Sequence, residues 1–370
     1  MKALTAGFSE ERLGPYYGGK SMLFRVFARN ELETLYEILA VNHVVGPVSR
    51  GKSKKGRELF AFDYLYDFQD LRLDFTTTTH SLKPFVLPFQ ETLSSFKVED
   101  DSWEKYVDLN IYKQHVFFGV HACDINALNK LDKVLSEQIY PDPFYTAKRR
   151  NMFIIGIDCH PQPFCFCRSM GTDTVLHGFD MLLTDLGDRY FVEIQSARAW
   201  DILQQIPTEE PDEEDHRRFV ETVEARNQAF SCQVDTSDLT KILDLEFQSP
   251  VWEEWGRRCL SCGTCANVCP TCYCYGVREH VDPDLQGASK IRQLYSCNLI
   301  DFAEVAGNHN FRPDSSSRLK YRYYHKHRGF QEVYEEPLCV GCGRCGQACL
   351  AGITVPEVIA SVRGQEEEDE

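Results

Sequence analysis

The alternation of hydrophobic and polar residues predicts a change of architecture along the chain. Early in the chain, residues 30–40 have the spacing of an amphipathic helix, and residues 59–68 have the pattern of a strand. Beyond about residue 110, short apolar runs alternate with helical stripes, which is typical of an α/β domain. Residues 181–194 then predict a hairpin that turns at Gly187.

The clearest α/β unit begins with a short buried strand. Strands are predicted at 115–120 and 151–159, and between them Leu128, Leu131 and Leu135 are spaced along one face of a helix. A strand–helix–strand unit of this length makes the two strands parallel, with a right-handed crossover. We therefore expect an N-terminal α/β domain that contains a parallel βαβ unit.

Charge and proline content indicate where this domain ends. Residues 207–218 are punctuated by proline and heavily charged, which predicts an exposed linker or loop. Acidic residues also fill the end of the chain, which predicts a disordered tail. The sequence thus predicts an α+β protein of two domains, at 1–240 and 241–362, with an acidic tail at 363–370.

Composition narrows the possible functions. The chain has 370 residues and a formal net charge of −16, which disfavours nucleic acid as a partner because duplex binding depends on neutralising phosphates. No stretch approaches the roughly 18 apolar residues of a membrane span, and the first residues lack the apolar core of a secretory signal. We therefore expect a cytoplasmic protein. In that compartment, sixteen cysteines favour metal binding over disulfides.

Two cysteine motifs carry the strongest signal. The first has the spacing C-x2-C-x2-C-x3-C-P, and the second repeats it with Leu350 in place of the proline. In proteins with two 4Fe–4S clusters, three cysteines of such a run bind one cluster and the fourth binds the other. The predicted ligands are Cys259, Cys262, Cys265 and Cys349 for one cluster, and Cys339, Cys342, Cys345 and Cys269 for the other. Because leucine restores a backbone N–H that proline lacks, we expect an altered environment at Leu350 but an intact cluster.

Two other interpretations of these motifs are weaker. A pair of zinc sites needs only paired C-x2-C halves, whereas each run here carries the further cysteines that two clusters require. Residues 341–346 also match the nucleotide-binding pattern G-x-G-x-x-G, but they do not follow a strand and they include the ligands themselves. We expect these glycines to let the backbone approach a cluster closely.

The long insert between the motifs predicts helices rather than a compact βαβ ferredoxin. Ile291, Leu294, Phe302 and Val305 have helical spacing, so we expect an α-helical, ferredoxin-like dicluster domain. Residues 316–329 are dense in Arg, Lys, His and Tyr. They form a solvated basic face, or they compensate the negative charge of the clusters, or they dock an electron donor.

Four further cysteines predict a third metal site, in the α/β domain. Cys123 follows one predicted strand and Cys159 ends the next, so both are expected at the carboxyl edge where such sheets place their sites. Cys165 and Cys167 return to this edge after a Pro-rich turn. Zinc would also accept four thiolates, but a third 4Fe–4S cluster is favoured because the same chain carries two other predicted 4Fe–4S clusters. A nucleophilic Cys123 and buried reduced thiols remain as alternatives.

The last four cysteines have no assigned role. Cys272, Cys274 and Cys297 lie close in sequence to the first motif or its insert. They are either additional ligands or packed thiols, and packing is favoured because a cubane cluster usually has four ligands. Nothing around Cys232 indicates a function.

In combination, these motifs resemble a known family. The ordered segments are "CPTCYC", "SCNLIDFAEVAGNHNFRP", "YHKHRGF" and "CVGCGRC", with "GVHACDINALNKLD", "DPFYTAKRRN" and "CFCRSMGTD" before them. They resemble the iron–sulfur beta subunit of soluble nickel–iron sulfhydrogenases and, equally, the iron–sulfur subunit of anaerobic sulfite reductase. The resemblance runs from about residue 80 to about residue 355, and Leu350 departs from the usual proline.

The resemblance implies a non-catalytic electron-transfer subunit of an anaerobic oxidoreductase complex. In that family, the subunit relays electrons through 4Fe–4S clusters between a flavin subunit that handles NAD(P)H and a separate catalytic subunit. The catalytic subunit would be of hydrogenase or sulfite reductase type, and the resemblance does not choose between them.

Functions of two other classes remain as alternatives. The α/β domain would bind flavin and reduce a small molecule, as in the distantly similar beta subunits of coenzyme-reducing hydrogenases, or the cysteines would hold structural zinc. A visible spectrum separates these cases. Clusters absorb broadly and bleach with dithionite, flavin gives structured yellow bands that are released on denaturation, and zinc is colourless.

Overall fold

The fold is described by a computed structural model over residues 23–53, 56–99, 102–109 and 114–365. The start of the chain, on which the absence of a secretory signal depends, lies outside these residues, as does the predicted acidic tail from residue 366. Within the described residues, no helix combines the length and the apolar character needed to cross a membrane.

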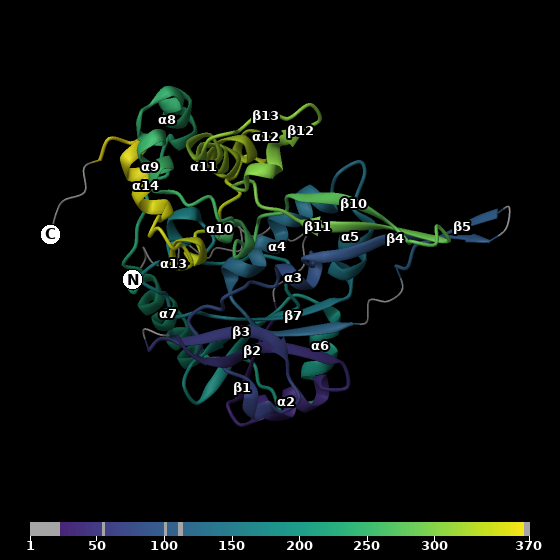
Figure 1. Cartoon of the computed structure of the whole chain (residues 1–370). Coiled ribbons are helices and arrows are strands. Elements are labelled where there is room, and N and C mark those ends of the chain that lie inside the picture. Colours follow the sequence, from purple (N-terminus) through teal and green to yellow (C-terminus); the bar gives the residue numbers. More distant parts are fainter. Residues whose placement is uncertain (1–22, 54–55, 100–101, 110–113, 366–370) are drawn as a thin grey trace.

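A seven-stranded mixed sheet forms one layer of the molecule (Figure 1). In spatial order its strands are β1 (Leu23–Ala28), β9 (Arg189–Ile194), β8 (Met181–Asp185), β7 (Met152–Ile157), β6 (His115–Val120), β2 (His43–Lys52) and β3 (Glu58–Tyr64). The four strands β8, β7, β6 and β2 run parallel, whereas β9, β1 and β3 pair antiparallel at the two edges. The sheet is therefore of the α/β type at its centre.

The predicted strand–helix–strand unit is confirmed. β6 and β7 pair in parallel, and α4 (Ala122–Leu135) connects them. The three leucines of its predicted stripe are buried in the main apolar core, as are most residues of the two strands. The predicted hairpin at Gly187 is also confirmed as the β8–β9 pair, and the first predicted helix is α2 (Glu31–Leu39).

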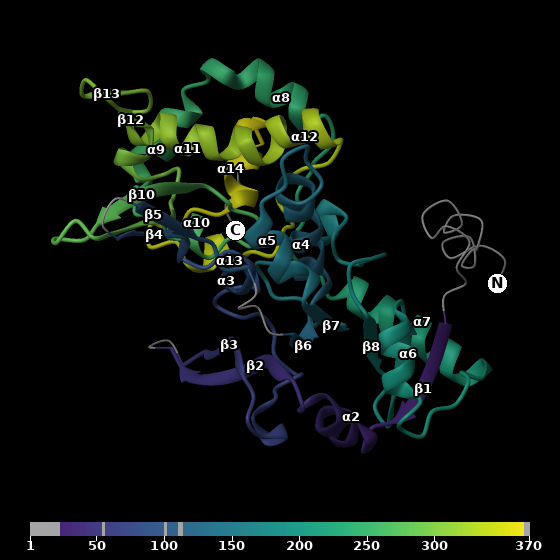
Figure 2. The same ribbon diagram turned by 90° about the vertical axis from the view of Figure 1, so that its right-hand side faces the viewer.

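Helices cover both faces of this sheet. The remaining ones in the N-terminal half are η2 (Phe68–Asp70), α3 (Lys83–Val86), α5 (Pro143–Arg150), η3 (Arg168–Met170), α6 (Ala197–Leu203) and α7 (Glu213–Gln228). In both views α4 and α5 lie between the sheet and the helices of the C-terminal half (Figure 2). The carboxyl ends of the parallel strands thus come near the cysteine-rich segments.

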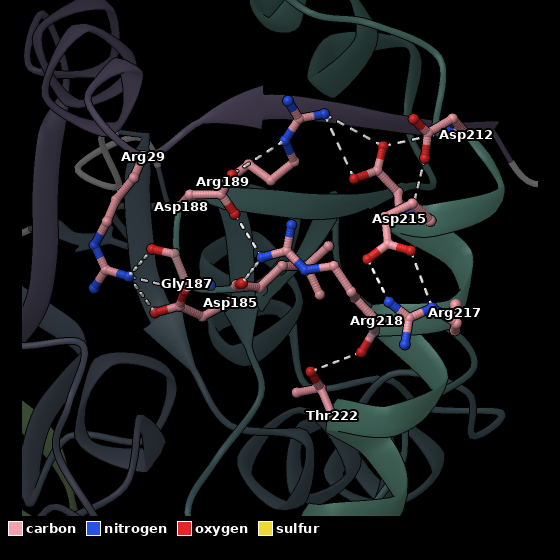
Figure 3. Close-up of polar contacts among 12 residues, drawn as sticks. Arg29, Asp185, Gly187, Asp188, Arg189, Asp212, Asp215, Arg217, Arg218 and Thr222 are labelled. Carbon is pink, nitrogen blue, oxygen red and sulfur yellow. Dashed lines mark hydrogen bonds and ion pairs between the residues drawn. The ribbon is translucent and has the colours of Figure 1, made fainter.

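The prediction of an exposed linker at 207–218 is wrong for its second half, because α7 begins there. The Asp212 side chain accepts a hydrogen bond from the Asp215 backbone N at 2.8 Å, and the Asp215 carboxylate accepts one from the Asp212 backbone N at 3.2 Å. Arg189 donates to the same buried carboxylate at 3.4 Å (Figure 3). Proline and acidic residues here mark the start of a helix, whose positive N-terminal end favours negative charge.

The cap on α7 provides a stability prediction. Asp212→Ala removes the side-chain acceptor, so we expect it to lower the free energy of unfolding by about 1 kcal/mol. Asp212→Asn keeps an acceptor oxygen at the same place and should cost much less. Urea denaturation of both variants measures the difference, and equal losses would show that the cap does not stabilise the helix.

A second sheet extends from the body of the molecule as an arm (Figure 1). Its antiparallel strands are, in order, β10 (Tyr275–Val281), β11 (Gly287–Leu294), β4 (Gln90–Glu99) and β5 (Ser102–Tyr106). At its base, buried Arg292 of β11 forms ion pairs with Glu91 of β4 and with Asp142, the residue before α5. The arm therefore joins the insert between the cysteine motifs to the N-terminal half.

The helical stripe predicted in this insert is wrong. Ile291 and Leu294 lie in β11, and Phe302 lies in the short helix η5 (Ile300–Ala303). Val305 lies in β12 (Glu304–Val305), which pairs with β13 (His309–Asn310). Pairing of β11 with β10 and β4 overrides the local pattern, since strand formation depends on neighbouring strands as much as on sequence.

Helices make up most of the remaining C-terminal half. They are α8 (Leu239–Leu245), η4 (Glu246–Gln248), α9 (Val251–Arg258), α10 (Thr264–Asn267), α11 (Ser315–Tyr324), η6 (His325–Gly329), α12 (Phe330–Tyr334), α13 (Arg344–Gln347) and α14 (Val355–Val362). A second apolar core, which includes Trp252, Leu319 and Val358, lies between α9, α11 and α14. The π-helical segment η6 continues α11 into α12, and such segments frequently mark functional sites.

Candidate iron–sulfur centres

A cavity beside α11 is lined by four thiols from both cysteine motifs. They are Cys269, Cys339, Cys342 and Cys345, the set predicted for one cluster. Cys269 belongs to the upstream motif and the other three to the downstream motif, yet all four line the same cavity. The structure thus brings together the crossed set of cysteines, and their donor chemistry fits an iron–sulfur cluster.

Burial controls the charge of these thiols. It raises the pKa of Cys339 to about 11 and the pKa of Cys342 and Cys345 to about 12. Cys269 differs, because a hydrogen bond with Cys272 and the nearby buried cations lower the pKa of its thiol. Iron binds the thiolate form, so loading this site would release protons.

Two buried cations lie against the thiols. Arg322 and Lys326 are one helical turn apart on α11 and η6, are only 7% and 5% exposed, and both line the cavity. Burial lowers the pKa of Lys326, but the thiolates of Cys269 and Cys272 outweigh burial and raise it, so the ammonium stays charged. At these positions the interpretation of residues 316–329 as a solvated face is wrong. Compensation of the negative charge of clusters stays a prediction for these two residues.

The thiols predicted for the other ferredoxin cluster are Cys259, Cys262, Cys265 and Cys349. Burial raises the pKa of Cys265 on α10, and the nearby thiols of Cys259, Cys269 and Cys262 raise it further. Asn298 Nδ2 lies 3.2 Å from the Cys265 sulfur, which suits a hydrogen bond to a ligand thiolate. Helices α10 and α13 are in contact, and Cys349, two residues after α13, packs against the same apolar core as Cys259. The neighbouring Leu350 is 79% exposed, so the side chain that replaces proline points away from the core.

Two of the four cysteines predicted for a third site lie at the carboxyl edge of the sheet. Cys123 lies in the first turn of α4 after β6, and Cys159 lies two residues after β7. After burial, the nearby thiols of Cys159 and Cys165 further raise the pKa of Cys167, and Cys167 contributes in the same way to the raised pKa of Cys123. Burial raises the pKa of all four thiols, with Cys159 at about 12.

This group lies directly against the downstream cysteine motif. The backbone N of Phe166 donates to the carbonyl of Gly341 at 2.8 Å. A Cβ at Gly341 would lie 2.6 Å from the Cys167 Cα, and one at Gly343 would lie 2.3 Å from the carbonyl oxygen of Phe164. Both glycines have positive φ, at 63° and 71°. They permit close approach of two cysteine-bearing loops, in addition to the predicted approach to a cluster.

Alanine at Gly343 tests this loop contact. The left-handed backbone alone costs an alanine about 1–2 kcal/mol, and the clash with Phe164 adds to it. Gly352 is the matched control, because its φ is 67° and a Cβ there would meet nothing within 4 Å. We expect Gly343→Ala to lower the free energy of unfolding clearly more than Gly352→Ala does. Equal losses in urea denaturation would contradict the proposed packing of the loops.

Arg344 joins the downstream cysteine motif to the first turn of α4 through a buried ion pair. It is 2% exposed and donates to both carboxylate oxygens of Asp124, at 2.6 and 2.7 Å. Its Nε donates to the carbonyl of Thr78 at 2.9 Å. Arg344 lies between two predicted ligands of the downstream motif, and Asp124 follows Cys123. Sequence reasoning missed both residues, because in sequence they look like ordinary surface charges. The one available signal was their position next to predicted ligands.

The remaining cysteines divide into two groups. Cys272, Cys274 and Cys297 line a second cavity, whereas Cys232 packs at the edge of the C-terminal apolar core. Among the residues that the structure describes, no three His, Cys, Asp or Glu side chains are placed to hold a single metal ion.

Comparison with known proteins extends over both halves of the chain. A family model described as a 4Fe-4S dicluster domain matches residues 258–353, which contain both cysteine motifs. The "Sulfhydrogenase 2 subunit beta" of Pyrococcus furiosus is 37% identical over 325 residues, which cover 87% of this chain and 93% of that protein. No solved structure matches the chain.

Proposed function

Because the chain belongs to the family of the sulfhydrogenase beta subunits, as its motifs predicted, we propose that it relays electrons between a flavin subunit that handles NAD(P)H and a separate catalytic subunit. It is an iron–sulfur electron-transfer subunit with a 4Fe–4S dicluster domain. The proposed catalytic partner is of hydrogenase or sulfite reductase type, and the chain itself carries no substrate chemistry.

The proposal places one 4Fe–4S cluster on each crossed set of ferredoxin cysteines. The observation that carries it is the cavity in which Cys269 of the upstream motif faces Cys339, Cys342 and Cys345 of the downstream motif. A bound cluster supplies one-electron chemistry at its iron atoms. Arg322 and Lys326 stabilise the more negative, reduced state, so they raise the reduction potential of this centre.

A third 4Fe–4S cluster on Cys123, Cys159, Cys165 and Cys167 extends the route into the α/β half. Its support is the position of Cys123 and Cys159 at the carboxyl edge of the sheet, together with the contact of the loop that carries Cys165 and Cys167 with Gly341 and Gly343. Direct loop contact keeps the gap between neighbouring centres short, which favours electron transfer. The α/β half would then serve as the end of the relay that faces one partner subunit.

Iron analysis of anaerobically prepared full chain tests the third cluster. We expect Cys123→Ser to contain about four iron atoms fewer than the unsubstituted chain, with the same loss of acid-labile sulfide. The signals of the remaining clusters in electron paramagnetic resonance should persist. An unchanged iron content would contradict this site, and a loss of zinc in place of iron would assign it to zinc.

A further inference from the structure

A second cavity, of about 290 Å³, is lined by the three cysteines that the predicted clusters leave unused. They are Cys272, Cys274 and Cys297. We propose that this cavity binds a further iron–sulfur cluster, separate from the ferredoxin pair and from the site in the α/β half. The proposal rests on the placement of the thiols, on the cations beside them and on the contact with the neighbouring cavity.

The base of the arm holds these thiols together. Cys272 and Cys274 precede β10, and Cys297 follows β11. The two strands pair from Tyr275 and Leu294 outward, and the backbone N of Tyr295 donates to the carbonyl of Cys274 at 2.9 Å. Strand pairing thus fixes the approach of two segments that are distant in sequence, and Cys297 is only 4% exposed.

Positive charge is shared between the two thiol-lined cavities. Arg322 and Lys326 line both of them. Arg322 Nη1 lies 3.5 Å from the Cys272 sulfur, and Lys326 Nζ donates to Thr271 Oγ1 at 2.7 Å. Because Arg322 and Lys326 are buried, their positive charge requires negative charge nearby. A thiolate-bound cluster in each of the two cavities would supply that negative charge.

The side chains around this cavity include residue types that bind clusters. Cys272, Cys274 and Cys297 line it together, although no three potential ligands among the described residues are placed to hold a single metal ion. Three thiolates hold three corners of a cubane. His325 also lines the cavity and is of a residue type that ligates iron in some iron–sulfur centres. Its Nε2 lies 3.1 Å from the Tyr273 hydroxyl, which orients the ring.

The cavity adjoins the route of the relay. The backbone N of Cys272 donates at 3.5 Å to the carbonyl of Cys269, a predicted ligand of the neighbouring cluster. A cluster here would accept one electron from that neighbour, with one ferric iron reduced as one ferrous iron is oxidised, and pass it on. Since Cys274 directly precedes β10, such a cluster would lie at the base of the arm (Figure 1).

Serine substitutions in the full chain test the proposal. Cys274→Ser and Cys297→Ser, prepared anaerobically, are each expected to lose one cluster in native mass spectrometry and about four iron atoms. Cys232→Ser is the control, because this half-buried cysteine lines neither cavity and its loss should leave the cluster count unchanged. An unchanged count in both cavity variants would overturn the proposal.

A second measurement decides the question even where these variants fail to fold. Cys123→Ser removes the site proposed in the α/β half and leaves the cavity intact. Three clusters in this variant support the inference, namely the ferredoxin pair and the one proposed here, and two clusters overturn it. Failure of the ferredoxin pair would be recognised independently, because the cysteines of both motifs would then react with an alkylating reagent in the unsubstituted chain.

Discussion

Cys269→Ser is expected to destroy the cluster held by the downstream motif and to leave the cluster of the upstream motif in place. The reason is that Cys269 lines the cavity of Cys339, Cys342 and Cys345 although it belongs to the other run of cysteines. Loss of an outer partner of a metal ligand typically costs about 10–100-fold in affinity or activity, so loss of a ligand should cost more. Electron transfer through the assembled complex should fall by at least that factor.

Alkylation followed by mass spectrometry reads out which cluster is lost. In the anaerobic variant, Cys339, Cys342 and Cys345 should become reactive, whereas Cys259, Cys262 and Cys265 should stay protected by their cluster. The unsubstituted chain should show protection of both sets, and Cys232→Ser provides a control for a neutral cysteine change. If the upstream cysteines became reactive instead, ligation within each run would replace the crossed assignment.

Local sequence was sufficient where a pattern and its physical cause lie in the same segment. The parallel unit of β6, α4 and β7 follows from apolar runs that are buried on both faces of a sheet. Cys123 and Cys159 then follow by topology, since the carboxyl ends of parallel strands lie at one edge. The same holds for the cysteine motifs, because the spacing within each motif is that of a loop wrapped around a cluster.

Sequence was insufficient where distant segments decide the outcome. Residues 287–294 become a strand because β4, far upstream, offers a pairing edge. Asp212 and Asp215 start a helix because Arg189 and the capping contacts outweigh the charge pattern of a loop. The basic stretch around Arg322 allowed several interpretations, and only its burial against thiols decides among them.

The ion pair of Arg344 with Asp124 leads to the second large effect, on stability. Asp124→Asn removes the carboxylate charge and leaves the Arg344 guanidinium buried with only neutral partners such as Thr78. Breaking a buried pair by removing one partner typically costs about 3–5 kcal/mol, because the remaining charge stays desolvated. We expect the free energy of unfolding to fall by that amount, with a matching fall in the midpoint of urea denaturation.

An exposed pair of the same chemistry provides the control. Arg29 donates to both carboxylate oxygens of Asp185, at 2.9 and 2.8 Å, but the two side chains are 53% and 39% exposed (Figure 3). Exposed pairs contribute about 0–1 kcal/mol, so Asp185→Asn should have little effect. Because Arg344 and Asp124 each adjoin cysteines of a proposed cluster, Asp124→Asn should also loosen the contact between the downstream motif and α4. Losses of similar size in the two variants would mean that the buried pair does not hold the motif against this helix.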